Sequence, residues 1–297
     1  MEKRTVCWGC GEEYSEDMLA AFGERLICGG CKPNYVQSVK ENVQPKSAIQ
    51  VGPDWLATSD LGLGGLLGRT FETYGRVFKP CLLMAVVIMG PLYLLMLALK
   101  VIAIQTSNPL LLMGNGILGL IAAILGFAPM IGVVHSVHRS TYGEMIDWRT
   151  ALSFGFRRFG DVFGTAFLGG LIVLGLFFLG IVPGIIWAIY YSFIIAVVAV
   201  TYQTGKDALD YSKSLVKGRW WRIFGYIFVI NLLVVFSTIL FAGAGAGLGI
   251  VHPVAGAIVG TGGEFINILL SYMGLTFSTL LFLNLHYQRQ AEIGHED

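Results

Sequence analysis

Six apolar runs, each long enough to cross a lipid bilayer, constrain the fold of this chain more than any other feature. We predict spans at 80–103, 110–138, 162–182, 185–203, 222–242 and 264–287. A helix needs about 20 residues to cross the hydrocarbon core. Only 13% of the 297 residues are charged, against about 25% in soluble domains. The sequence therefore predicts an all-α polytopic membrane protein with six transmembrane helices.

The basic residues are segregated to one side of this six-span layout. Every Lys and Arg except Lys100 falls before the first span, in the second-to-third or fourth-to-fifth connection, or in the tail. Cytoplasmic loops of membrane proteins carry such an excess of basic residues, and the charged N-terminus has no signal-peptide pattern. We therefore expect both termini in the cytosol. The net charge of +1 indicates no attraction to nucleic acid.

Three basic amphipathic stretches, at 61–79, 147–160 and 204–217, each precede a pair of predicted spans. Basic residues lie on the polar face of each predicted helix, and the second stretch places Arg157 and Arg158 there. Such interfacial helices can bind an anionic leaflet or pack on the protein's own membrane domain, and both alternatives stay open. The pattern indicates either an internal threefold repeat or the ordinary preference of membrane entry points for Arg beside aromatic residues.

The segment 243–263 is apolar but rich in glycine, and a His-Pro pair interrupts it. It can be an extension of the fifth helix, a re-entrant loop or a segment packed on the outer surface. Small residues four positions apart let two helices approach closely. Gly243 with Gly247, and Gly256 with Gly260, have this spacing.

Four cysteines near the N-terminus form two Cys-x-x-Cys pairs, Cys7 with Cys10 and Cys28 with Cys31. Their spacing falls within the range of four-cysteine zinc sites, and two intervening residues let both thiolates of a pair reach one ion. A hairpin is expected between the two pairs. We predict that residues 1–38 form a small cytosolic zinc ribbon, in which these four cysteines bind one structural Zn²⁺.

Two other chemistries fit the same four cysteines: iron in a rubredoxin-like site, or a redox dithiol. The reduced cytosol favours metal binding over disulfides. Because four cysteines fill a tetrahedral shell, no open position for catalysis is left. The metal then stabilises a domain whose own core is too small to fold alone. The fifth cysteine, Cys81, begins a span and is predicted to be an inert apolar residue.

Two segments resemble a known bacterial family: ALDYSK at 208–213 and LVKGRW at 215–220. With Pro183-Gly184, they resemble the six-span membrane domain attached to some glycerophosphodiester phosphodiesterases and found in related bacterial membrane proteins. The resemblance implies a bacterial cytoplasmic (inner) membrane protein. The phosphodiesterase catalytic domain has no counterpart in the chain, so that activity is not implied. The cysteine pairs resemble zinc-ribbon or treble-clef modules.

These predictions give an order of domains along the chain. The zinc ribbon at 1–38 is followed by a polar linker at 39–60, the six-helix membrane domain at 61–290 and a cytosolic tail at 291–297. Neither an acid–base pair nor a nucleophile with a spaced base appears in the spans. His135 and His138 share a helix face, where they can bind a metal or serve as ordinary polar groups at the membrane boundary. Glu264 is the one carboxylate near the outer start of a span, where it marks either a pathway or the water interface.

The function expected from this pattern is non-enzymatic. We predict an integral membrane scaffold or accessory subunit that lies in the lipid bilayer. Its protein partner would bind through the zinc ribbon or the membrane surface, or the partner would be a second copy of the chain. The alternative is a transporter or lipid-handling protein, because repeats and broken helices are common in transporters.

Overall fold

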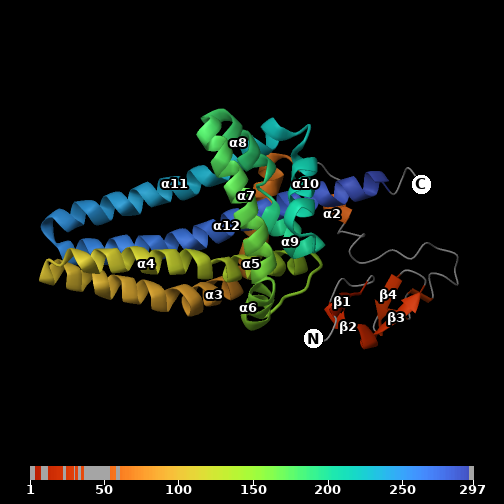
Figure 1. The fold of residues 1–297 in the computed structure, drawn as a ribbon, viewed down its shortest axis with the longest axis horizontal. Helices are drawn as coiled ribbons and strands as arrows, with labels where there is room; N and C mark the ends of the chain where they lie inside the picture. The colour runs from red at the N-terminus through yellow and green to blue at the C-terminus, as the bar shows by residue number, and fades with distance from the viewer. Residues whose placement is uncertain are drawn as a thin grey trace. The chain divides into compact units, whose positions relative to one another are not determined.

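A computed structural model describes residues 4–7, 13–22, 25–29, 31–32, 35–36, 54–57 and 61–293. The chain divides into two compact units (Figure 1). One unit contains residues 1–60 with 283–297, and the other contains residues 61–282. Most of the predicted linker and the end of the predicted tail lie outside the described residues.

The first unit contains two short antiparallel strand pairs. Strand β1 (Arg4–Val6) pairs with β2 (Glu13–Ser15), and β3 (Leu19–Phe22) pairs with β4 (Arg25–Cys28). A single 3-10 turn, η1 (Glu16–Met18), joins the two pairs. The β3–β4 pair confirms the hairpin that was predicted between the two cysteine pairs. Helix α2 (Asp54–Ala57) belongs to the same unit, and its Leu56 carbonyl accepts a 2.7 Å hydrogen bond from the Asn284 amide.

Six helical segments of the described chain are long and apolar enough to cross a membrane, which confirms the prediction of six long apolar helices. These segments are Leu63–Thr106, Met113–Thr141, Phe159–Leu179, Ile181–Thr201, Trp220–Val251 and Pro253–Gln290. The helices that form them are α3 (Leu63–Thr106), α4 (Pro109–Leu125), α5 (Phe127–Thr141), α7 (Phe159–Leu179), α8 (Ile181–Tyr190), α9 (Ile194–Thr201), α11 (Trp220–Val251) and α12 (Pro253–Ile293). Their surfaces carry many exposed large apolar side chains, such as Phe178 and Ile250, as expected for helices that face lipid.

Helix α3 joins the first predicted amphipathic stretch and the first span into one continuous helix. Its 44 residues measure about 66 Å at 1.5 Å per residue, about twice the hydrocarbon thickness. Pro80 and Pro91 both lie inside this helix. On the predicted apolar face of its first half, Leu66, Thr70 and Val77 are buried.

The fourth span is broken, which the sequence pattern did not predict. Helix α8 ends at Tyr190, a tight turn follows, and α9 begins at Ile194. Polar side chains from neighbouring helices bind the carbonyl groups around the break. The Ser212 hydroxyl donates to the Tyr190 carbonyl at 2.7 Å, and the Trp220 indole donates to the Ile186 carbonyl at 3.2 Å. Broken helices are tolerated inside a membrane where such partners exist.

Two short helices occupy the second and third predicted amphipathic stretches: α6 (Trp148–Arg157) and α10 (Gly205–Val216). Their buried residues pack on the membrane helices. In α6, a side chain at Gly155 would overlap the backbone of Ala128 on α5. In α10, Ala208 and Leu209 are buried together with Ser212, Leu215 and Val216. These contacts favour the alternative in which the helices pack on the protein's own membrane domain.

The prediction that Arg158 lies on an exposed polar face is wrong. Arg158 is only 8% exposed. Its guanidinium donates a 3.1 Å hydrogen bond to the Val198 carbonyl and lies 4.5 Å from the centre of the Tyr202 ring. Tyr202 ends α9 with a positive φ of 60°, so the last carbonyls of α9 lack their helical partners. Arg158, which lies in the turn between α6 and α7, therefore caps α9.

The glycine-rich segment forms the ends of two helices. Helix α11 continues to Val251 and α12 begins at Pro253. The two helices touch through glycine: a side chain at Gly256 would meet the Gly249 backbone at 2.5 Å, and one at Gly245 would meet the Gly260 backbone at 3.1 Å. The predicted contact through Gly256 and Gly260 is therefore confirmed. A side chain added at Gly243 or Gly247 would meet nothing within 4 Å, so these two glycines stay a prediction as a contact.

Candidate metal centre

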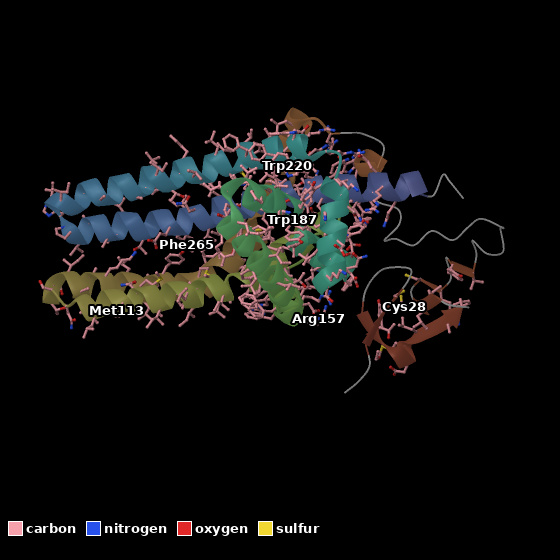
Figure 2. The ribbon with its side chains drawn as sticks, turned by 45° about the horizontal axis from the view of Figure 1, so that its top comes forward. Cys28, Met113, Arg157, Trp187, Trp220 and Phe265 are labelled. Carbon is pink, nitrogen blue, oxygen red and sulfur yellow. The ribbon has the colours of Figure 1, made fainter. Side chains whose placement is uncertain are left out.

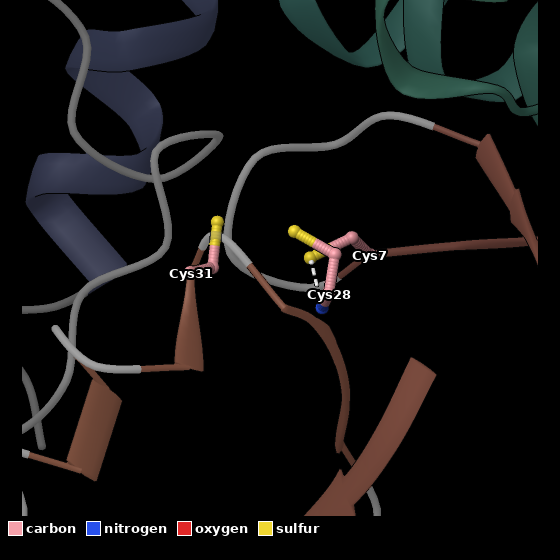
Figure 3. A group of neighbouring side chains, drawn as sticks. All are labelled: Cys7, Cys28 and Cys31. Atoms are coloured by element: carbon pink, nitrogen blue, oxygen red, sulfur yellow. Dashed lines mark hydrogen bonds between the residues drawn. The ribbon is translucent and has the colours of Figure 1, made fainter. Parts of the chain in front are cut away.

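Three of the four predicted zinc ligands lie together in the N-terminal unit. Cys7 directly follows β1, Cys28 ends β4, and Cys31 lies in the turn that follows β4. The sulfur atoms of these three residues all lie within 4.8 Å of one another (Figure 3). Cys7 is fully buried and Cys28 is 4% exposed. The fourth predicted ligand, Cys10, lies outside the described residues.

Backbone hydrogen bonds connect the three cysteines, which bind metals in their thiolate form. The Cys28 N–H donates to the Cys7 sulfur at 3.1 Å, and the Cys31 N–H donates to the Cys28 carbonyl at 3.1 Å. Burial raises the pKa of the Cys28 thiol. Hydrogen bonds outweigh burial and lower this pKa to about 7; their partners are the Cys31 backbone and the side chains of Cys7, Cys31 and Tyr14. The lowered pKa favours the thiolate form of Cys28.

The three sulfur atoms fit a tetrahedral metal ion with little adjustment. Zinc–sulfur bonds of about 2.3 Å in a tetrahedron place the sulfurs about 3.8 Å apart. Two sulfur atoms at the observed limit of 4.8 Å would have to move about 1 Å closer together to bind one ion. Cysteine thiolates bind zinc and iron in such sites. In the part of the chain that the structure describes, this is the one cluster of three or more potential metal ligands.

The described core around the three cysteines is small. Ile27 is fully buried with Cys7 and Cys28, and a few half-buried side chains pack around them, including Phe22 and Tyr35. The rings of Phe22 and Tyr35 lie 5.1 Å apart. A core of this size cannot offset the conformational entropy lost on ordering the segment. A bound metal would supply folding free energy that the apolar contacts do not.

The remaining cysteine and the histidine pair have other surroundings. Cys81 is fully buried within α3, in the other unit of the chain. The His135 ring stacks on Phe154, with centres 4.0 Å apart, and His138 contacts the edge of Tyr142. These aromatic contacts favour the interpretation of the histidines as ordinary polar groups at the membrane boundary.

One polar contact in the membrane unit was not predicted. Lys100 and Glu264, which belong to α3 and α12, form an ion pair of 3.1 Å, and Lys100 also donates to the Thr261 hydroxyl at 3.2 Å. The sequence held a signal for this contact. Lys100 is the one basic residue assigned to the outer side, and Glu264 is the one carboxylate near the outer start of a span.

Comparisons with known proteins add no assignment. No family model matches the chain, and no curated protein or solved structure matches it. The resemblance to the membrane domain of glycerophosphodiester phosphodiesterases therefore stays a prediction. Function has to be argued from the cysteine cluster and the six apolar helices.

Proposed function

We propose that this protein is a non-enzymatic integral membrane scaffold or accessory subunit whose N-terminal module binds one structural zinc ion. The observation that carries the proposal is a cluster of three buried or half-buried cysteines in a chain with six apolar helices. With Cys10 as fourth ligand, cysteine would fill the whole tetrahedral shell of the metal. Such a site stabilises a small fold and leaves its surface for a partner, because no coordination position stays open for a substrate.

The aromatic and basic residues near the start of α11 support a cytosolic membrane surface at this level. Figure 2 labels Trp220, the first residue of α11. The Trp220 and Trp221 rings lie 4.8 Å apart, Trp221 is 78% exposed, and the Arg222 guanidinium lies 5.5 Å from the centre of the Tyr226 ring. Trp and Tyr concentrate at both membrane surfaces, and basic residues concentrate in the cytoplasmic loops. We place the termini and the zinc module in the cytosol, and the protein in the bacterial inner membrane that the resemblance implies.

A second candidate function is lipid handling or transport. Two observations favour it: the break between α8 and α9 within the fourth span, and a cavity among the membrane helices. Discontinuous helices and midplane cavities are features of transporters. The described spans contain few buried ionisable groups, which makes proton-coupled pumping a weaker alternative than lipid binding.

The scaffold proposal is tested by the protein mass of the native particle. Full-length protein, extracted with its lipid into polymer nanodiscs, should give a native mass above the 32.3 kDa of one chain. Cys28→Ser should reduce the mass if the partner binds through the zinc module, and Cys81→Ser is the matched control that should keep it. A homo-oligomer joined through its membrane helices would persist in both variants. A wild-type particle that contains a single chain and nothing else contradicts the proposal.

A further inference from the structure

A cavity of about 290 Å³ lies among α3, α4, α5 and α12, within the unit formed by residues 61–282. Its walls are mainly apolar, with Met89 and Met96 on α3, Gly119 and Ala122 on α4, and Ile268 on α12. This volume is close to the lower end of the range for ligand pockets, about 300–1,000 Å³. The cavity therefore suits a narrow apolar group better than a bulky solute.

A polar cluster lies one helical turn beyond the cavity along two of these helices. Lys100 follows Met96 by four positions on α3, and Glu264 precedes Ile268 by four positions on α12. Four residues rise about 6 Å in a helix and stay on the same face. The Lys100–Glu264 ion pair and the Thr261 hydroxyl thus lie at one end of the cavity.

An unsatisfied amide lies at the corresponding position on α4. Asn115 precedes Gly119, a lining residue, by four positions. Its side chain is buried, at 8% exposure, and neither its nitrogen nor its oxygen has a hydrogen-bond partner in the described structure. The side-chain oxygen of Asn267, next to Ile268, is also buried without a partner. Because buried polar groups in native proteins nearly always have partners, these amides point to a bound polar group.

The polar cluster lies at the level of the outer membrane surface. Lys79, near the cytosolic start of the first span, and Lys100 are on the same helix. The rise between them is about 31 Å, which equals the thickness of the hydrocarbon core of about 30 Å. The cavity then lies within the outer half of the bilayer, and the polar cluster lies where lipid headgroups are.

We propose that the cavity and the polar cluster bind one phospholipid with a zwitterionic amine headgroup, such as phosphatidylethanolamine, from the outer leaflet. A segment of its acyl chain fills the cavity, its phosphate contacts Lys100 and Thr261, and its ammonium group contacts Glu264. Asn115 donates to an ester carbonyl of the lipid.

The charges of the site explain the choice of headgroup. A paired cation and anion match the two charges of a zwitterion, whereas a purely anionic headgroup is repelled by Glu264. The inference rests on the membrane placement proposed above and gives the lipid-handling alternative a defined site. It is independent of the zinc proposal, because every residue of the site belongs to the unit of residues 61–282.

Native mass spectrometry tests the site on delipidated full-length protein in detergent. The probes are phosphatidylethanolamine and phosphatidylglycerol with identical acyl chains, added in equal amounts. The wild type should bind one phosphatidylethanolamine with a preference of about tenfold. Gly119→Leu should weaken this binding by about tenfold or more, because the new side chain enters the cavity, where only the Met96 methyl lies as near as 4.0 Å.

Matched variants separate the bound lipid from the surrounding lipid. Gly116→Leu makes the same change on the same helix at an exposed position with nothing within 4 Å, and it should leave binding unchanged. Glu264→Gln removes the carboxylate and should reverse the preference toward phosphatidylglycerol. Cys28→Ser should leave lipid binding as in the wild type, because Cys28 belongs to the other unit of the chain. Failure of the lipid site can therefore be distinguished from failure of the scaffold proposal.

Two results would overturn the inference. Equal retention of the two lipids by the wild type would show that only surrounding lipid is bound. Equal retention of phosphatidylethanolamine by wild type and Gly119→Leu would show that the cavity is not the site. If Gly119→Leu does not fold, as judged by circular dichroism and elution volume, Glu264→Gln decides alone: an unchanged preference would then refute the headgroup assignment.

Discussion

Replacing Cys28 with Ser is expected to release the metal and to disorder the N-terminal module. Cys28 has 4% exposure, and its sulfur lies within 4.8 Å of the Cys7 and Cys31 sulfurs, so its loss removes one ligand from the cluster. Structural zinc contributes about 10–16 kcal/mol to small domains at neutral pH, far more than the few buried side chains around Ile27 can supply. Zinc analysis should fall from one ion per chain to none. Hydrogen exchange should increase throughout the peptides that cover β1 to β4.

The six helices should be unaffected by this substitution, because their insertion depends on the apolar runs that follow the module. Cys81→Ser makes the same chemical change at a buried position in α3 and should leave the zinc content at one per chain. Wild-type protein without stoichiometric zinc would contradict the assignment. So would a disulfide between cysteines of the module in freshly isolated protein, because it would indicate a redox dithiol or a module outside the cytosol.

Arg158→Met should lower the stability of the membrane unit by about 2 kcal/mol or more. The substitution removes the hydrogen bond to the Val198 carbonyl and leaves a buried acceptor at the end of α9 without its partner. Hydrogen bonds that involve charged groups contribute about 1.5–3 kcal/mol. The Arg158–Asp161 ion pair adds little, because the Asp161 side chain is 47% exposed. Thermal unfolding in detergent should shift down by roughly 5 °C.

Arg157→Met is the control for this prediction. Arg157 is adjacent in sequence and exposed, so its replacement should change the unfolding temperature by less than half as much. Similar shifts for the two variants would mean that charge near the membrane surface stabilises the protein. The role of Arg158 as a cap on α9 would then be wrong.

The sequence predicted the number and order of the spans because a membrane imposes a length and a composition on each one. It did not predict where the helices end. The first amphipathic stretch continues into the first span through Gly75 and Pro80, although proline usually interrupts a helix. The break at 191–193 carries no proline or glycine, and it depends on the Ser212 and Trp220 side chains from elsewhere in the chain. Pairing of this kind cannot be derived from local pattern.

The candidate site residues were also predicted only in part. The cysteine spacing sufficed to group Cys7, Cys28 and Cys31, because the cysteines of a metal site recur at short, characteristic spacings. Gly245 and Gly249 were missed because every other residue from 243 to 249 is glycine, so the spacing alone does not select the face that meets α12. The pairing of Lys100 with Glu264 depends on how α3 packs on α12. Periodicity gives the faces of single helices and does not select which helices pack together.

The most direct test of the account is the side of the membrane on which each connection lies. Intact cells are treated with a membrane-impermeant maleimide. Ser107→Cys, between α3 and α4, and His252→Cys, between α11 and α12, should react. Thr204→Cys, before α10, should react only after permeabilisation. The native N-terminal cysteines should react only after permeabilisation combined with metal removal. Labelling of Thr204→Cys or of the native cysteines in intact cells would place the cysteine module outside the cytosol and contradict the account of a six-span protein with a cytosolic zinc module.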